Sequence, residues 1–361
     1  MPARTKVKAE KDPAPSVGRV RVSAATAGAT YFASSAERDG LEFFSTGCAL
    51  LDQVMGGGYV LGRMTNVIGD KSTGKTLLAI EAVINFLRKW VDGYVRYAEA
   101  EAAFDQKYAA AMGMPITQVD WASMLSEDGE NDRTVEWLFD DITATIKKLK
   151  GRPGLYIVDS LDALSDRDEL ERDISKGSFG QAKAKKIGEL FRRLAGEIES
   201  SRLCVLIISQ IRDKIGVTFG ETKQRSGGHA MDFYATHCLW LSQIATLKKT
   251  VDKLERPIGL TIRAKCKKNK VGLPLRECEF PLLFGYGIDD VTASVEFLIN
   301  AGREKRLEEL GMSKAGYKLM LPKLRNAGGP EMAELRTKLN AIVLKEWADI
   351  ELKFLPTSSK Y

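Results

Sequence analysis

Eight residues at positions 69–76, GDKSTGKT, constrain the fold of this 361-residue chain more than any other stretch. They match the pattern G-x-x-x-x-G-K-[ST], follow the apolar run MTNVIG and precede the helical stretch KTLLAIEAVINFLRKW. Glycines permit backbone angles that turn successive N–H groups inward, and these groups bind phosphate together with the positive end of the helix. We therefore predict a strand–loop–helix unit with Lys75 on the β and γ phosphates and Thr76 on Mg²⁺. The predicted phosphate-binding residues are Gly69, Asp70, Lys71, Ser72, Thr73, Gly74, Lys75 and Thr76.

Short apolar runs alternate with helical stretches along the middle of the chain. LYIVDS and LCVLIISQ are predicted strands, and KAKKIGELFRRLAGEIES between them has helical periodicity. This alternation predicts an α/β fold with a mostly parallel central sheet. HCLWLSQI, IGLTIRAKC and ECEFPLLF then follow one another without long helices, so we expect antiparallel strands to extend the sheet. We also expect a disordered basic arm at 1–16 and a small α-rich C-terminal domain at 289–361.

Composition excludes several classes of site. With only His229 and His237 in the chain, a histidine-rich metal site and most histidine-based catalysis are excluded. The five cysteines are scattered without a CxxC pair, which is typical of buried thiols in a reducing cytosol. No apolar run reaches the roughly 18 residues of a membrane span, and the N-terminus lacks an apolar signal segment, so we expect a cytoplasmic protein with no membrane partner. The net charge of +6 favours polyanionic partners.

Carboxylates at the ends of predicted strands complete the nucleotide chemistry. LYIVDS places Asp159 at the carboxyl end of a strand, where ligands bind in parallel sheets, and this makes it a predicted Mg²⁺ ligand as well as a possible strand cap. Hydrolysis also needs a group that orients or deprotonates water. YAEAEAAFD offers Glu99 and Glu101 for this role. Period-2 alternation puts both on one side, so spacing does not choose between them, and a solvated charge pair is the alternative.

A long polar stretch follows another predicted strand. In IISQIRDKIGVTFGETKQRSGGHA the strand ends on Gln210, and a basic loop runs from there to a glycine pair. Loops longer than about 12–15 residues are uncommon in compact domains and are usually functional or disordered. The residues of interest in this loop are Arg212, Lys214, Lys223, Arg225, Gly227 and Gly228.

Several of these segments resemble the RecA-type strand-exchange recombinases, and the bacterial RecA pattern most of all. The likeness runs from about residue 44 to about residue 287, and divergence elsewhere suggests a remote member, such as one encoded by a bacteriophage. It implies a RecA-like core at 46–288 and a DNA-dependent ATPase that uses ATP and Mg²⁺. It also implies a helical filament on single-stranded DNA that pairs with homologous duplex DNA. The segments that carry the likeness are FSTGCALLDQVMGGG, GRMTNVIGDKSTGKT, AEAEAAFDQKYAAAMG, YIVDSLDAL, FRRLAG, SQIRDKIGVTFG, SGGHAMDFYA and KKNK.

The resemblance assigns roles around the nucleotide. It selects Glu101 as the catalytic glutamate and matches Asp105 and Tyr108 to the residues that contact adenine. Gln210 matches the glutamine that senses the γ-phosphate and begins the second DNA-binding loop, at 211–228. One residue at the strand edge would then order the loop behind it when phosphate is bound.

The resemblance also places the first DNA-binding loop at 166–180. This loop, DRDELERDISKGSFG, is more acidic than its role suggests, and Lys176 and Phe179 are its predicted DNA contacts. A core position at a helix start is the alternative for Phe179. In the second loop, Lys223 and Arg225 stand where bacterial RecA has an acidic and a small polar residue, a change that favours phosphate contact.

Subunit contacts follow from the same resemblance. Lys268 and Lys270 in KCKKNK match lysines that reach the ATP of the neighbouring subunit, although lysines also protect exposed edge strands. The segment 17–45 is expected to pack on the next subunit, with Tyr31 or Phe32 as its anchor, and Phe233 occupies an interface position. Two other functions remain open. They are a hexameric helicase-like motor of the same superfamily and a non-catalytic, ATP-gated DNA-binding mediator.

Overall fold

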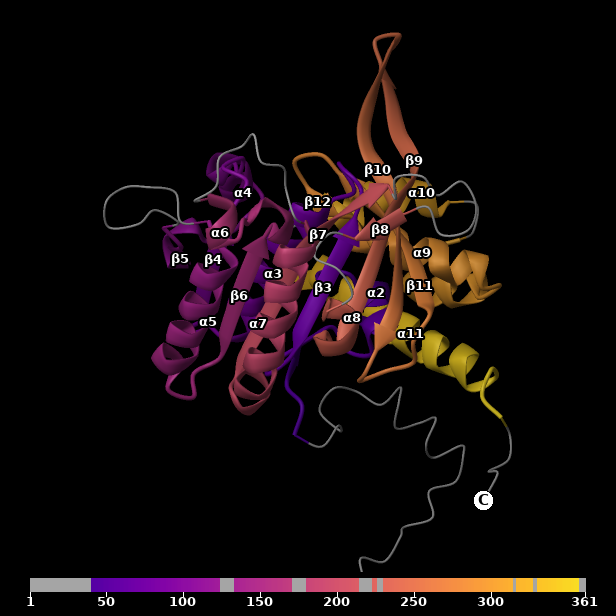
Figure 1. The fold of residues 1–361 in the computed structure, drawn as a ribbon. Coiled ribbons are helices and arrows are strands. Elements are labelled where there is room, and N and C mark those ends of the chain that lie inside the picture. The colour runs from indigo at the N-terminus through magenta and orange to yellow at the C-terminus, as the bar shows by residue number, and fades with distance from the viewer. Residues whose placement is uncertain are drawn as a thin grey trace, which may run out of the picture.

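The computed structural model describes residues 40–123, 133–170, 180–213, 223–225, 230–313, 316–326 and 330–356. Its centre is one large sheet with the strand order β12-β11-β10-β9-β3-β7-β6-β4-β5, and β8 pairs with β7 (Figure 1). A separate small ladder joins β1 (Phe43–Phe44) to β2 (Tyr59–Val60). The strands of the large sheet are β3 (Met64–Gly69), β4 (Tyr94–Glu99), β5 (Val119–Trp121), β6 (Gly154–Asp159), β7 (Leu203–Asp213), β8 (Lys223–Arg225), β9 (His237–Val251), β10 (Leu254–Asn269), β11 (Arg276–Leu283) and β12 (Gly287–Ile288).

The sheet has a parallel part and an antiparallel part, as the sequence predicts. Strand β3 pairs in parallel with β7 and β9, and β6 pairs in parallel with β4 and β7. Strands β9, β10, β11 and β12 follow one another as antiparallel neighbours. Strands β3 and β6 are buried along their whole length, which explains why they read as mostly apolar runs in the sequence.

Helices cover both faces of the sheet. Alternate residues of β6 belong to different hydrophobic clusters, because successive side chains of a strand point to opposite faces. One cluster contains α3 and the C-terminal helices, and the other contains α5, α7 and α8. The helices are α2 (Ala49–Met55), α3 (Lys75–Lys89), α4 (Gln106–Ala111), α5 (Val135–Leu149), α6 (Arg167–Leu170), α7 (Gly180–Ser200), α8 (Ala230–Tyr234), α9 (Asp290–Asn300), α10 (Tyr317–Asn326) and α11 (Pro330–Leu352), with the 3-10 turns η2 (Ile116–Gln118), η3 (Leu161–Ala163) and η5 (Glu304–Leu310).

The C-terminal region is α-rich. Helices α9, α10 and α11 share one hydrophobic cluster with α2, α3 and β11. Asp290 joins α9 to the core, because its Oδ1 accepts a hydrogen bond from the backbone N–H of Ala49 at the start of α2 (2.7 Å). The division of the chain into a core domain that ends at residue 288 and a C-terminal domain that begins at residue 289 stays a prediction.

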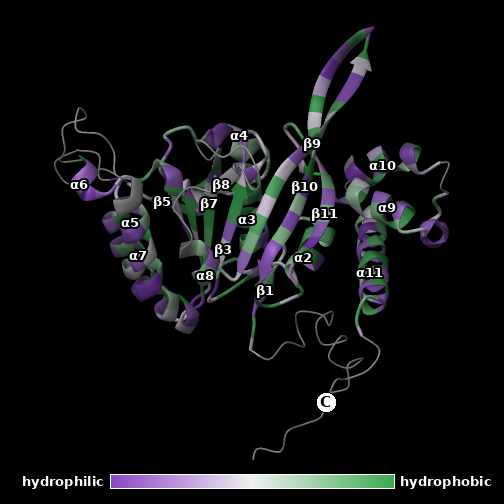
Figure 2. Cartoon of the chain, turned by 45° about the vertical axis from the view of Figure 1, so that its right-hand side comes forward, coloured by the Kyte–Doolittle hydropathy of each residue, from purple (hydrophilic) through white to green (hydrophobic). Residues whose placement is uncertain are grey.

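A long hairpin is the feature that the sequence patterns do not predict. Strands β9 and β10 run on beyond the sheet and are joined through Asp252 and Lys253, which both have positive φ angles (50° and 66°), as tight hairpin turns require. Figures 1 and 2 show this hairpin standing clear of the other described elements. Its outer half is exposed on both faces.

All five cysteines are buried, as expected. Among the helices that the structure describes, none combines the length and apolar character of a bilayer span.

Candidate nucleotide and DNA site

The phosphate loop lies at the carboxyl end of the central strand β3. Gly74 is the N-cap of α3 and has a φ of 81°, a left-handed conformation that favours glycine. A Cβ at this position would lie 2.4 Å from Leu282 Cδ1, so a larger residue would also have to displace the end of the Leu282 side chain. The backbone carbonyl of Asp70 accepts hydrogen bonds from Lys75 Nζ (2.7 Å) and Thr73 Oγ1 (2.9 Å). These bonds close the loop around the lysine.

One cavity of about 330 Å³ brings together the predicted phosphate-binding residues from Lys71 to Thr76 with Glu101, Asp159 and Gln210, whereas Gly69 and Asp70 are not among its lining residues. Burial lowers the pKa of Lys75, while the charges of Asp159, Glu101, Asp162 and Asp70 oppose this change. Burial outweighs these four carboxylates, so the pKa of Lys75 stays below its ordinary value. The lining residues are Lys71, Ser72, Thr73, Gly74, Lys75, Thr76, Leu77, Glu101, Asp159 and Gln210.

Asp159 and Thr76 form the part of the cavity that suits a metal. Burial raises the pKa of Asp159 to about 6, although hydrogen bonds from Tyr97 Oη (2.9 Å) and Thr76 act in the opposite direction. The hydroxyl and the carboxylate are hydrogen-bonded neighbours. This pair fits Mg²⁺, which binds oxygen, keeps several waters and shares phosphate oxygens.

The structure gives Glu99 and Glu101 different partners. Strand β4 ends at Glu99, and Ala102, with a φ of 54°, lies in the turn just beyond Glu101. Of the two, only Glu101 lines the described cavity. Its Oε1 accepts hydrogen bonds from Ser160 Oγ (2.5 Å) and Gln210 Nε2 (2.8 Å), whereas Glu99 accepts the backbone N–H of Ala103 (3.1 Å). The expectation that both glutamates lie on one side of the strand stays a prediction.

The two predicted adenine contacts lie beside helix α4. The Asp105 carboxylate caps α4 by accepting the backbone N–H groups of Lys107 (2.9 Å) and Tyr108 (3.0 Å). Tyr108 is 39% exposed, and its Oη accepts the N–H of Gly285 (3.3 Å). Neither Asp105 nor Tyr108 is among the described residues that line the phosphate cavity. Their role toward adenine stays a prediction.

The second loop begins differently from the expectation. Strand β7 does not end at Gln210 but continues to Asp213, because β8 pairs with its last three residues. Ile211 lies opposite Arg225, and Asp213 opposite Lys223, so Gln210 leads directly into an antiparallel ladder. Of the predicted DNA contacts, Arg212, Lys223 and Arg225 lie on this ladder, whereas Lys214, Gly227 and Gly228 lie outside the described residues.

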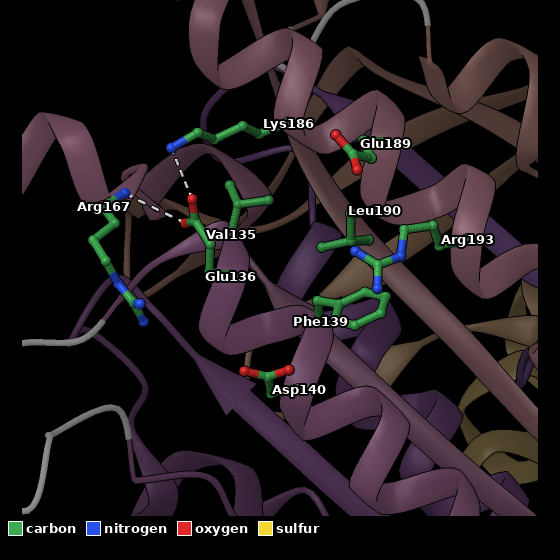
Figure 3. A pocket seen from close by; sticks show the side chains of 9 residues that line it. All are labelled: Val135, Glu136, Phe139, Asp140, Arg167, Lys186, Glu189, Leu190 and Arg193. Carbon is green, nitrogen blue, oxygen red and sulfur yellow. Dashed lines mark hydrogen bonds and ion pairs between the residues drawn. The ribbon is translucent and has the colours of Figure 1, made fainter.

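The base of the first loop is held by an ion-pair cluster. Lys186 of α7 pairs with Glu136 (2.8 Å), Asp168 (2.8 Å) and Asp166 (3.6 Å). Figure 3 shows Lys186 and the backbone N–H of Arg167 both reaching Glu136, at one end of a cavity of about 450 Å³ between α5 and α7. Two of the acids in this loop, Asp166 and Asp168, therefore bind Lys186. Lys176 and Phe179 lie outside the described residues.

Lys268 and Lys270 lie far from the phosphate loop of their own chain. Lys268 Nζ donates to the backbone carbonyls of Asp232 and Phe233 (2.9 Å to the latter), and Lys270 Nζ donates to Phe233 (3.2 Å). Neither lysine is among the described residues that line the cavity. Both lie beside Phe233, whose side chain is 71% exposed.

Three functional neighbours were missed by sequence reasoning. Tyr97 contacts Asp159, Ser160 contacts Glu101, and the Asp162 carboxylate accepts the backbone N–H of Gln210 (2.6 Å). A signal was available for two of them, because Ser160 and Asp162 directly follow the strand that carries Asp159. Together, a phosphate loop at the end of a central parallel strand and acids at the ends of neighbouring strands define a phosphate-loop nucleotide-binding protein.

Comparison with known proteins gives the family. The family model described as RecA N-terminal domain matches residues 27–289. Protein RecA of Prochlorococcus marinus (strain MIT 9211) is 34% identical over 256 residues, which are 71% of this chain and 65% of that protein. Protein RecA of Synechococcus sp. (strain CC9902) is 32% identical over 267 residues, which are 74% of this chain and 66% of that protein. Protein RecA of Nostoc sp. (strain PCC 7120 / SAG 25.82 / UTEX 2576) is 32% identical over 275 residues, which are 76% of this chain and 72% of that protein. The chain belongs to the RecA family.

Proposed function

We propose that this protein is a DNA-dependent ATPase that assembles into helical filaments on single-stranded DNA and promotes homologous pairing and strand exchange. One observation carries the proposal. Gln210 lines the nucleotide cavity, and it directly precedes the β7–β8 ladder, which starts at Ile211. This ladder leads into the basic second loop, so one residue joins the nucleotide cavity to the proposed DNA-binding loop.

The roles of the cavity residues follow from their chemistry. Lys75 and the loop N–H groups bind the phosphates, and Thr76 and Asp159 would hold Mg²⁺, which would supply positive charge to the phosphates. Glu101 orients or deprotonates the attacking water. Gln210 Nε2 donates to Glu101 in this structure, and a γ-phosphate oxygen is the competing acceptor for the same amide. Exchange between these acceptors would move the start of the second loop when ATP binds.

Assembly completes the proposed mechanism. Lys268 and Lys270 of one subunit contribute positive charge to the ATP of the next, as an arginine finger does in trans. DNA contacts come from the second loop and from Lys176 and Phe179 of the first. Homologous duplex DNA is then the second DNA partner.

The test combines microscopy with hydrolysis. We expect filaments whose length follows the DNA when the protein is imaged by negative-stain electron microscopy with single-stranded DNA and a slowly hydrolysed ATP analogue. We also expect single-stranded DNA to stimulate phosphate release from ATP. Rings of fixed size would favour a helicase-like motor instead. Filaments without DNA-stimulated phosphate release would favour a non-catalytic mediator.

A further inference from the structure

The backbone of Gln210 lies where one neighbouring strand has already ended. Strand β6 stops at Asp159, and its described pairing with β7 ends at Val158 and Ile207. The chain then turns through η3, and the N–H of Gln210 donates to Asp162 Oδ2 at 2.6 Å. The carboxylate thus takes the place of a strand partner. Hydrogen bonds to a charged acceptor are shorter and stronger than neutral ones.

Asp162 is itself held by the helix that follows the first loop. Lys183 Nζ in α7 donates to the backbone carbonyl of Asp162 (2.9 Å). Leu161, the preceding residue, is buried in the cluster under α5 and α7. The turn that carries the carboxylate is therefore anchored on both sides, and it connects the helix after the first loop with the strand before the second.

Two carboxylates hold Gln210 in different ways. Asp162 binds its main chain, and Glu101 binds its side-chain amide at 2.8 Å. When the Gln210 side chain changes its hydrogen-bond partner, the following loop moves only if the backbone of Gln210 is held in one conformation. If that backbone is free to move, it adjusts to the new partner and the loop stays where it is.

We propose that Asp162 is a positioning residue that fixes the backbone of Gln210 and thereby sets the strength of coupling between nucleotide binding and DNA binding. The coupling part rests on the proposed function. Asp162 does not line the described phosphate cavity, and although its charge contributes to the field at Lys75, its hydrogen bond is to the backbone of Gln210.

Two variants and a control separate this role from a general effect on folding. Asp162→Ala removes the acceptor, whereas Asp162→Asn keeps an acceptor oxygen of the same shape without the charge. Asp92→Ala is the matched control, because Asp92 is an exposed aspartate in the turn after α3, away from the cavity. The Asn variant keeps the test available if the Ala variant fails to fold.

The first measurement is amide hydrogen exchange in the 203–213 segment without ligand. We expect exchange at Gln210 to be at least about tenfold faster in Asp162→Ala than in the wild type, with Asp162→Asn between them, because a charged acceptor contributes more than a neutral one. Asp92→Ala is expected to match the wild type. Unchanged exchange at Gln210 in Asp162→Ala would overturn the proposal.

The second measurement is the ratio of single-stranded DNA affinity with and without the slowly hydrolysed ATP analogue. We expect Asp162→Ala to lower this ratio by about tenfold while the analogue's own Kd without DNA changes by less than about threefold. A purely structural role would weaken the affinity for single-stranded DNA equally with and without the analogue and would leave the ratio unchanged. That result would also overturn the proposal. A wild-type protein without any such coupling would refute the proposed function instead, and exchange at Gln210 would still decide whether Asp162 holds that residue.

Discussion

Catalysis completed between subunits is the prediction that the geometry makes most specific. The backbone N–H of Lys270 donates to Thr236, and the N–H of Thr236 donates to Met64 at the start of β3. The phosphate loop begins at Gly69, at the other end of that strand. Five steps at about 3.3 Å place these ends about 17 Å apart, whereas a lysine side chain reaches only about 6 Å. Lys270 therefore cannot reach the phosphates of its own chain without a large rearrangement.

Two inactive variants test this directly. Lys75→Ala removes phosphate binding but keeps the lysines, and Lys268→Ala/Lys270→Ala removes the lysines but keeps the phosphate loop. Each variant alone is expected to release almost no phosphate from ATP. In a head-to-tail filament each active site uses one loop and the lysines of the next subunit. Random equimolar mixing then makes one interface in about four complete, so we expect up to about a quarter of wild-type ATP turnover.

The assay is phosphate release on single-stranded DNA over a series of mixing ratios. Turnover is expected to peak near equal amounts, because the number of complete interfaces is the product of the two fractions. Co-assembly is checked by differently labelled subunits in the same filaments. Mixtures that co-assemble but never exceed the sum of the two parents would refute the reasoning and assign the lysines a role within one chain or at a strand edge.

Four further predictions concern other parts of the chain. Glu101→Gln is expected to bind ATP and DNA but to hydrolyse ATP at least about 10²-fold more slowly in a phosphate-release assay; near-normal turnover would move the role to Glu99. Phe179→Ala is expected to cost about 1–3 kcal/mol of single-strand affinity with little change in salt slope, if its ring stacks on a base. In the second loop, a variant with alanine at four positions is expected instead to weaken affinity for single-stranded DNA and to flatten the slope of log Kd against log salt by about 0.7 per lost contact. The four positions are Arg212, Lys214, Lys223 and Arg225. An unchanged slope would mean that the DNA binds elsewhere. Burial raises the pKa of Asp290 from an ordinary 3.8 to about 6. Between pH 3.8 and pH 6 the folded chain therefore holds a proton that the unfolded chain has released. Because of this group, the free energy of unfolding falls as the pH rises from 3.8 to 6. Asp290→Asn is therefore expected to flatten that fall in the free energy of urea unfolding from pH 4 to 6, and an unaltered pH profile would contradict the assignment.

The sequence alone determined the elements whose signals are local. The phosphate loop was predictable because its glycines, lysine and threonine occupy fixed spacings between a buried strand and a helix, and the hydrogen bonds that close it join residues at most five positions apart. The parallel strands were predictable for a similar reason, since burial on both faces requires an unbroken apolar run. Asp159 followed from the rule that ligands gather at the carboxyl ends of such strands.

Only the tertiary structure decided which of the remaining residues meet. Glu101 and Gln210 are 109 residues apart in sequence, and Asp162 and Gln210 are 48 apart, so no local period relates them. Residue spacing left Glu99 and Glu101 open and the resemblance favoured Glu101, but only the fold shows that Glu101 lines the cavity. The extension of β7 past Gln210 depended on β8 lying beside it. Side-chain periodicity records which face of an element is buried. It carries no information about where an element ends in space or about which distant backbone group hydrogen-bonds to a given carboxylate. Those contacts form only when the packing of the whole sheet brings the strands together.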